Sequence, residues 1–171
     1  MAFIDCVYRF AVSPAGRTLD RQSVRWLGLS PLGMFFARHR RVAYNPHVLL
    51  TTLGRRTGRR RTVVLPCFRC LAPDENIVVV GSRGGAASDP QWVHNLRAEP
   101  ACWVRERRVL RRARARIAAG SERAELWRSI TERAPVYLQY QARAKGIREI
   151  PVIVLEGEVA RSESTREPPG A

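Results

Sequence analysis

The chain has 171 residues and a formal net charge of +15, a length that allows one compact domain with terminal extensions and excludes two full enzyme domains. With 45% hydrophobic and 26% charged residues, its composition is that of a folded protein. No apolar run approaches the roughly 18 residues of a membrane span, and Asp5 and Arg9 interrupt what would be the apolar part of a signal peptide. We therefore expect a cytoplasmic protein.

Arginine supplies almost all of the positive charge, since Lys145 is the only lysine. Guanidinium groups bind phosphates and carboxylates in a planar, bidentate manner. The excess therefore indicates an anionic partner, which could be a nucleic acid, an anionic membrane surface or a small polyanionic ligand. The total charge does not distinguish among these partners, so we consider where the arginines lie in the sequence.

Residues 1–46 are expected to form a helical extension. The segment breaks at Ser13-Pro14 and at Ser30-Pro31, and the apolar stretches around Trp26 and Met34 fit two short helices followed by a basic cluster at 38–41. Such a helix can lie at the inner face of a membrane as a peripheral contact, or it can cap a protein core. Both interpretations remain open from the sequence.

Residues 47–157 are predicted to form a sheet with inserted helices. Apolar, β-branched runs predict strands at 48–52, 62–71, 76–80, 102–105, 110–117 and 151–155. The turn at 73–76 predicts a hairpin between the second and third strands. In the fifth strand, arginines at 112, 114 and 116 alternate with Ala113, Ala115 and Ile117, a period of two that favours a strand with one arginine face over a helix.

Three helices are expected among these strands, at 90–99, 121–133 and 135–146. Asp89 is predicted to be the N-cap of the first, with Pro90 at its first helical position. The order of elements predicts an α+β, mainly β fold: a small barrel with packing helices. Residues 158–171 are acidic and polar without an apolar period and are expected to be a disordered tail.

Two glycine-containing loops follow strands and are candidates for an anion site. Five arginines lie between Gly54 and Thr62 and repel one another unless an anion binds, although an exposed basic hairpin tip is the simpler alternative. This segment lacks the pattern of a phosphate-binding P-loop. In Gly81-Ser82-Arg83-Gly84-Gly85 the backbone N–H groups can cradle a phosphate or a polar ring edge. Together the loops predict two walls of one anionic cofactor site.

Two tyrosines, Tyr137 and Tyr140, lie three residues apart and share one face of the helix at 135–146. Their phenols can donate hydrogen bonds or protons and their rings can stack on a planar ligand, but plain core packing also explains them. The spacing Cys67-x-x-Cys70 does not predict a metal site, because no second ligand pair is present and the two side chains point to opposite faces of a strand. Any chemistry is expected to come from a cofactor.

Four separated motifs resemble the deazaflavin (F420)-dependent nitroreductase and F420H2-dependent quinone reductase family, an actinobacterial group. They are residues 49–58 with Arg61-Thr62, residues 81–85, Pro90-x-Trp92-x-x-Asn95-Leu96 with Pro100, and Tyr137-x-x-Tyr140-Gln141 ahead of Ile150-Pro151-Val152. The resemblance spans Val48 to Leu155. It implies a split β-barrel, coenzyme F420 with a phosphodiester and oligoglutamate tail, and hydride transfer from carbon 5 of the reduced deazaflavin to a quinone, enone or nitroaromatic.

The resemblance also implies a set of site residues. The cofactor would contact Arg55, Arg56, Thr57, Arg61, Thr62, Val63, Val64, Leu65, Pro66, Val80, Gly81, Ser82, Arg83, Gln91, Trp92, Val93, His94, Asn95 and Tyr137. Tyr137 and Ser82 would act on the acceptor, and Tyr140 and Ala134 would line the substrate pocket. Ala134 stands where members that reduce nitroimidazole drugs have a tyrosine, which argues against that activity here.

Two other classes of function stay open from the sequence. One is a non-catalytic basic protein that binds nucleic acid or an anionic membrane, and the other is a split-barrel relative that uses FMN or haem. A nucleic-acid binder would spread its basic residues over a continuous surface. Here two loops converge with a tyrosine helix, which favours a small-molecule hydride acceptor as the partner. The oligomeric state does not follow from the sequence.

Overall fold

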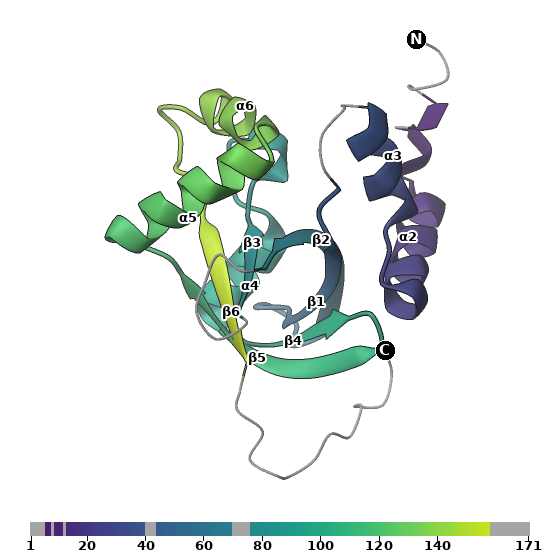
Figure 1. Ribbon diagram of the computed structural model, residues 1–171. Helices are drawn as coiled ribbons and strands as arrows, with labels where there is room; N and C mark the ends of the chain where they lie inside the picture. The colour runs from purple at the N-terminus through teal and green to yellow at the C-terminus, as the bar shows by residue number, and fades with distance from the viewer. Residues whose placement is uncertain (1–5, 8, 12, 40–43, 70–75, 158–171) are drawn as a thin grey trace.

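The computed structural model describes residues 6–7, 9–11, 13–39, 44–69 and 76–157. In this part of the chain six antiparallel strands close into a barrel in the order β1-β2-β3-β6-β5-β4 (Figure 1). Closure leaves the sheet without a first and a last strand, although β2 and β3 are joined by only two residue pairs, Cys67 with Val79 and Phe68 with Val78. The strands are β1 (His47–Leu53), β2 (Arg60–Phe68), β3 (Ile77–Val80), β4 (Ala101–Glu106), β5 (Val109–Ile117) and β6 (Val152–Gly157).

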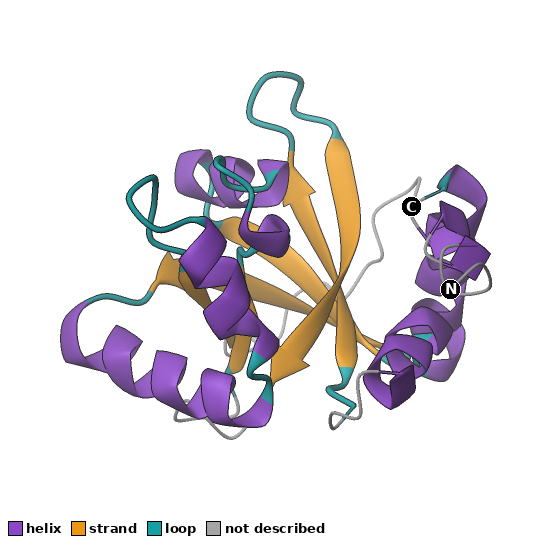
Figure 2. Ribbon diagram, turned by 90° about the horizontal axis from the view of Figure 1, so that it is seen from above, coloured by secondary structure: helices purple, strands orange, loops and turns teal. Residues whose placement is uncertain are grey.

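Helices pack on two sides of the barrel. They are α2 (Pro14–Leu27), α3 (Pro31–His39), α4 (Gln91–Ala98), α5 (Gly120–Arg133) and α6 (Val136–Arg143), with a short 3-10 turn η1 (Arg83–Gly85). Figures 1 and 2 show α2 and α3 on one side, and α5 and α6 on the other. The predicted barrel with packing helices is therefore confirmed.

Two apolar clusters hold these layers together. The first fills the barrel interior with inward side chains of the strands and is closed by α4, and it includes Val48, Leu50, Val79, Trp92, Leu96, Val104 and Ile153. The second lies between the outer faces of β3 and β6 and the helices α5 and α6, and it includes Phe68, Val78, Val154, Leu126, Ile130 and Tyr137. Burial of these apolar surfaces is the main driving force for the fold.

The predicted strands all occur, with shifted ends. β2 begins at Arg60 because the ladder with β1 continues to the pair Leu53 and Arg60. It ends at Phe68 instead of residue 71, and the predicted turn at 73–76 and the tail at 158–171 lie largely or wholly outside the described residues. In β5, Ala113 and Ala115 are buried and the alternating arginines are exposed, so the predicted arginine face is confirmed.

Two helix boundary predictions are wrong. The helix predicted at 135–146 ends at Arg143. Pro90 rather than Asp89 occupies the N-cap position of α4, with no side-chain hydrogen bond to the helix. The Asp89 carboxylate instead lies 2.6 Å from a guanidinium nitrogen of Arg148 and 2.6 Å from one of Arg97. Two cations stabilise a nearly buried carboxylate more than one capping N–H does, so tertiary contacts override the local pattern.

The N-terminal helices are tied to the start of β1 by buried polar contacts. The hydroxyl of Ser30 donates to the carboxylate of Asp20 at 2.7 Å, and the backbone N–H of Ser30 donates to the Tyr44 hydroxyl at 3.0 Å. The Tyr44 ring stacks on His47 at 5.4 Å between centroids. Burial lowers the pKa of His47, so the packed state favours the neutral imidazole.

Candidate functional site

The barrel has an open side along β2. This strand pairs with β1 over seven residue pairs, from His47 with Pro66 to Leu53 with Arg60. It pairs with β3 only at Cys67 and Phe68. Within the described chain, the backbone groups of residues 60–66 that point away from β1 therefore pair with no strand. Such a row of N–H and C=O groups can hydrogen-bond the polar edge of a flat molecule.

Side chains of β2 alternate between two faces, so the predicted run from Arg61 to Pro66 does not form one wall. Val63 and Leu65 pack against the barrel interior, and Arg61 shares their register at the barrel mouth, opposite Thr52. The remaining side chains of the run, Thr62, Val64 and Pro66, lie on the outer face opposite Thr51, Leu49 and His47. Among the inward residues of this run, Arg61 is exposed and can reach a ligand with its side chain, whereas Val63 and Leu65 are only partly exposed.

The basic loop 54–59 is the tip of the β1–β2 hairpin, and Arg55, Arg56 and Thr57 are exposed there. Asn95 fixes this loop to α4. Its side-chain carbonyl accepts from the Arg55 backbone N–H at 3.2 Å, and its amide nitrogen donates to the Thr52 hydroxyl at 3.0 Å. Because both ends of this buried amide are engaged, Asn95 positions the loop rather than offering a free group to a ligand.

The other predicted residues of α4 separate into two groups. Trp92 and Val93 are buried in the barrel interior. Gln91 is exposed and His94 is partly exposed. Only these last two side chains are accessible on α4 among the predicted contacts, so the helix contributes mainly to the shape of the barrel mouth.

The second predicted wall begins at Val80, the last residue of β3, and continues through Gly81 and Ser82 to Arg83. Val80 itself is buried in the outer apolar cluster. Gly81 is buried, and a Cβ there would lie 2.8 Å from both Pro151 and Val93, which requires glycine. Arg83 adopts a left-handed φ of 46°. The Ser82 side chain is partly exposed, and its hydroxyl makes no hydrogen bond within the described residues, so it is available to a ligand.

Arg148 holds this wall in place, a role that the sequence motifs did not indicate. Its guanidinium donates to the carbonyls of Gly81 at 3.2 Å, Ser82 at 2.8 Å and Ala86 at 2.9 Å, and to the Asp89 carboxylate at 2.6 Å. The Arg148 side chain is only 11% exposed. One side chain therefore fixes the path of the chain from the end of β3 to the start of α4. The only signal in the sequence is an arginine near a predicted buried strand, which is too weak to identify the role.

The tyrosine helix α6 packs against the same wall. A Cβ on Gly85 would lie 2.5 Å from the Tyr140 carbonyl oxygen, so the two backbones are in close contact. The rings of Tyr137 and Tyr140 meet edge to face at 5.8 Å, which confirms the predicted shared face. Tyr137 also packs against Phe68 and Trp127, and its burial raises the pKa of the phenol.

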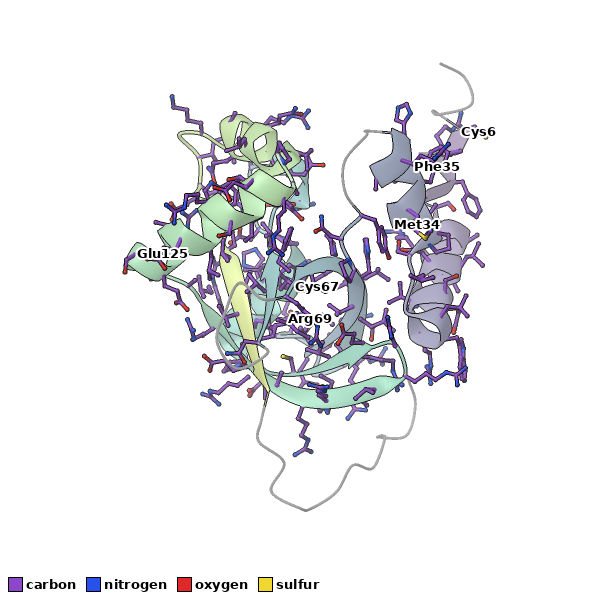
Figure 3. The ribbon with its side chains drawn as sticks, viewed as in Figure 1. Cys6, Met34, Phe35, Cys67, Arg69 and Glu125 are labelled. Atoms are coloured by element: carbon purple, nitrogen blue, oxygen red, sulfur yellow. The ribbon has the colours of Figure 1, made fainter. Side chains whose placement is uncertain are left out.

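Ala134, a predicted pocket residue, and Cys67, which belongs to the C-x-x-C spacing, both lie inside the protein. Ala134 is buried in the outer cluster, at the end of α5 and next to α6. Cys67 lies within the barrel (Figure 3), where burial raises the pKa of its thiol to about 12; Cys70 is outside the described residues.

In the described part of the chain no group of three His, Cys, Asp or Glu side chains could hold a metal ion, and no helix is long and apolar enough to span a membrane.

Comparison with known proteins identifies the family. The family model for F420H(2)-dependent quinone reductase matches residues 37–157. The chain belongs to this family. It is 33% identical over 120 residues to the F420H(2)-dependent quinone reductase Rv1261c of Mycobacterium tuberculosis, covering 68% of this chain and 77% of that protein. The predicted family, F420 as cofactor and a reductase activity are therefore confirmed, against the alternatives of a non-catalytic basic protein and an FMN or haem protein.

Solved structures agree with the fold. The F420-H2 dependent reductase FDR-A superimposes with a TM-score of 0.56 at 33% identity, covering 65% of this chain and 94% of that one. A chain described as a domain-swapped dimer gives a TM-score of 0.56 at 29% identity, covering 74% of this chain and 100% of that one. The split-barrel fold class is thus shared with an F420H2-dependent reductase.

Proposed function

We propose that the open side of β2, the basic loop 54–59 and the turn 81–85 together hold coenzyme F420 for reduction of a planar, quinone-like acceptor. The observation that carries this proposal is the backbone edge of residues 60–66, which pairs with no strand among the described residues, beside an accessible Ser82. A flat heterocycle with a polar edge fits such a row of backbone groups. When bound, the reduced deazaflavin supplies a hydride from carbon 5.

The anionic tail of this cofactor fits the basic loop. Arg55 and Arg56 are exposed, and no carboxylate pairs with either of them within the described residues. Unpaired guanidinium groups bind phosphate and carboxylate through charge-assisted hydrogen bonds. Because Asn95 anchors the Arg55 backbone, these two side chains extend from a fixed base.

Ser82 and Tyr137 are proposed to act on the acceptor, in different ways. The phenol of Tyr137 is protonated at neutral pH, as that of an unperturbed tyrosine is, and burial raises its pKa further, so it can donate a hydrogen bond but gives up its proton reluctantly. Tyr137 therefore orients and polarises the acceptor carbonyl. Ser82 offers a hydroxyl without a partner in the described chain, and it can relay a proton from solvent to the reduced oxygen. Tyr140 is proposed to border the acceptor, and Ala134, which is buried in the cluster that Tyr140 packs against, to support it.

We further propose a cytoplasmic location with peripheral membrane contact through the N-terminal extension, residues 1–46, ahead of the barrel domain 47–157 and the tail 158–171. Several apolar side chains of the extension are exposed, namely Leu19, Trp26, Leu27, Leu29 and Met34. Apolar side chains beside arginines favour an anionic lipid surface. Sedimentation with anionic vesicles but not with neutral vesicles would support this contact, and sedimentation with neither would exclude it. The mycobacterial relative supports an actinobacterial source.

The central proposal is tested by titration with F420. We expect the deazaflavin fluorescence to be quenched at micromolar concentrations, with FMN producing no comparable binding. Turnover of F420H2 is then followed with a quinone and with a nitroimidazole as alternative acceptors, and only the quinone is expected to be reduced. Absence of F420 binding at micromolar concentrations would overturn the proposal.

A further inference from the structure

A cavity of about 290 Å³ lies outside the barrel, between α2 and the outer faces of β1, β2, β4 and β5. Among the described residues, its lining includes none from the loop 54–59, the turn 81–85, α4 or α6. It shares only Thr62 with the predicted cofactor contacts, because this side chain points to the outer face of β2. The cavity is thus a separate feature on the side of the N-terminal helices.

The cavity is strongly basic. Arg21 and Arg25 of α2 approach it from one side, and Arg60 and Arg105 of the barrel approach it from the other. None of the described residues that line it is acidic. Arg21 and Arg60 pair with no carboxylate in the described part of the chain. Four cations around one small space, two of them unpaired in this way, produce a potential that attracts an anion.

Part of the cavity lining is apolar. Leu49 and Leu110 line it together with the ring of Trp103. The guanidinium of Arg60 stacks 4.7 Å from the centre of that ring. At the edge, the hydroxyls of Thr51 and Thr62 lie 2.8 Å apart. Since one of these hydroxyls donates to the other, the accepting hydroxyl keeps its own proton to offer to a ligand.

We propose that this cavity is a second ligand site, which takes a small planar carboxylate. The apolar body rests on Leu49 and Leu110 beside Trp103, and the carboxylate meets Arg21 and Arg60. A volume near the lower end of the range for ligand pockets, about 300 to 1,000 Å³, fits one or two fused rings and excludes a molecule with the length of F420. Because α2 and the barrel each supply an arginine, such a ligand links the N-terminal extension to the barrel.

The test uses 2-naphthoate as the anionic probe and 2-naphthamide as its neutral match, with binding to the full chain measured by calorimetry. We expect naphthoate to bind and the amide to bind at least about tenfold more weakly. Arg60→Gln and Arg21→Gln should each weaken naphthoate binding at least about fivefold. Arg17→Gln is the matched control, because Arg17 is an exposed arginine of α2 that does not line the cavity.

Repeating the titration with saturating F420 separates the two sites. Unchanged naphthoate affinity supports a second site, whereas displacement by F420 shows that the cavity belongs to the cofactor groove and overturns the proposal. It is also overturned if naphthoate does not bind at millimolar concentration, if the amide binds equally well, or if Arg17→Gln weakens binding as much as the cavity variants do. Melting temperatures of all three variants confirm that each remains folded.

Discussion

Replacing Arg148 should loosen the wall that follows β3 and weaken cofactor binding. In Arg148→Met the carbonyls of Gly81, Ser82 and Ala86 lose their donor, and the Asp89 carboxylate loses its more buried cation. The backbone at Ser82 is then free to move away from the open side of β2. The variant tests whether one side chain far from the loop in sequence determines the geometry of the site.

The magnitude follows from the burial of the pair. Both side chains are about one-tenth exposed, with relative areas of 11% for Arg148 and 9% for Asp89. Removing one partner of a buried pair costs about 3–5 kcal/mol. Arg97 remains 2.6 Å from Asp89. We therefore expect the loss in the free energy of unfolding to lie at the lower end of this range, about 3 kcal/mol. For a chain of this size that corresponds to a fall in melting temperature of about 6–12 °C.

Three variants, measured by thermal melting and F420 titration, test whether Arg148 positions the cofactor site or only stabilises the fold. Arg97→Met removes the other cation on Asp89, but that arginine is 45% exposed, so we expect a cost below about 1 kcal/mol and unchanged F420 affinity. Arg148→Lys restores a charge beside Asp89 without the planar fork that reaches three carbonyls, and it should recover more stability than affinity. If Arg148→Met and Arg97→Met melted alike and bound F420 alike, the reasoning would be refuted.

Three further predictions concern the tail, the acceptor and the N-terminal helices. Arg55→Ala combined with Arg56→Ala should weaken F420 binding by about 1.5–3 kcal/mol for each charge-assisted hydrogen bond that is removed, with a smaller effect of added salt than in the wild type; equal weakening for a tail-truncated deazaflavin would exclude a role in binding the tail. Tyr137→Phe should lower turnover roughly ten- to a thousandfold while F420 affinity moves by less than about 1 kcal/mol, and an unchanged rate in a normally melting variant would remove Tyr137 from the mechanism. Burial lowers the pKa of His47, so the unfolded chain binds a proton at higher pH than the folded chain does, and the free energy of unfolding should fall below about pH 6.5. In His47→Phe the free energy of unfolding should fall less between about pH 7.5 and 5.5. The same pH dependence in the variant and the wild type would contradict this.

The strands could be predicted from the sequence because their signals are local. β-branched runs such as Ile77–Val80 and the alternation of alanine with arginine in β5 specify both the element and its buried face. The closure of β1 against β4 could not be predicted in this way, because it joins residues about 50 positions apart, as in the pair Thr51 and Trp103. The order of strands and helices predicted a small barrel, and the resemblance to a family specified a split barrel.

The sequence predicted which segments form the candidate site, but it did not predict which residues of those segments face a ligand and which face the protein interior. Motifs give residues in chain order, whereas a strand sends neighbours to opposite faces. Val63 and Val64 therefore end up on opposite sides of β2, although the resemblance implied one role for both. Asn95 shows a related limit: its residue type suits a ligand contact, but Thr52 and the Arg55 backbone already use both ends of its amide.

The arginines show why charge alone does not identify a function. Arg148 is buried in hydrogen bonds to its own chain, and Arg116 is neutralised by Glu122 and Glu156 at 2.5 Å each. Neither is available to an external anion, although each counts equally toward the net charge. Arg55 and Arg56 are exposed without a carboxylate partner in the described chain, at the end of a strand whose backbone edge is also unpaired. An anionic cofactor is therefore expected where unpaired charge and unpaired backbone coincide.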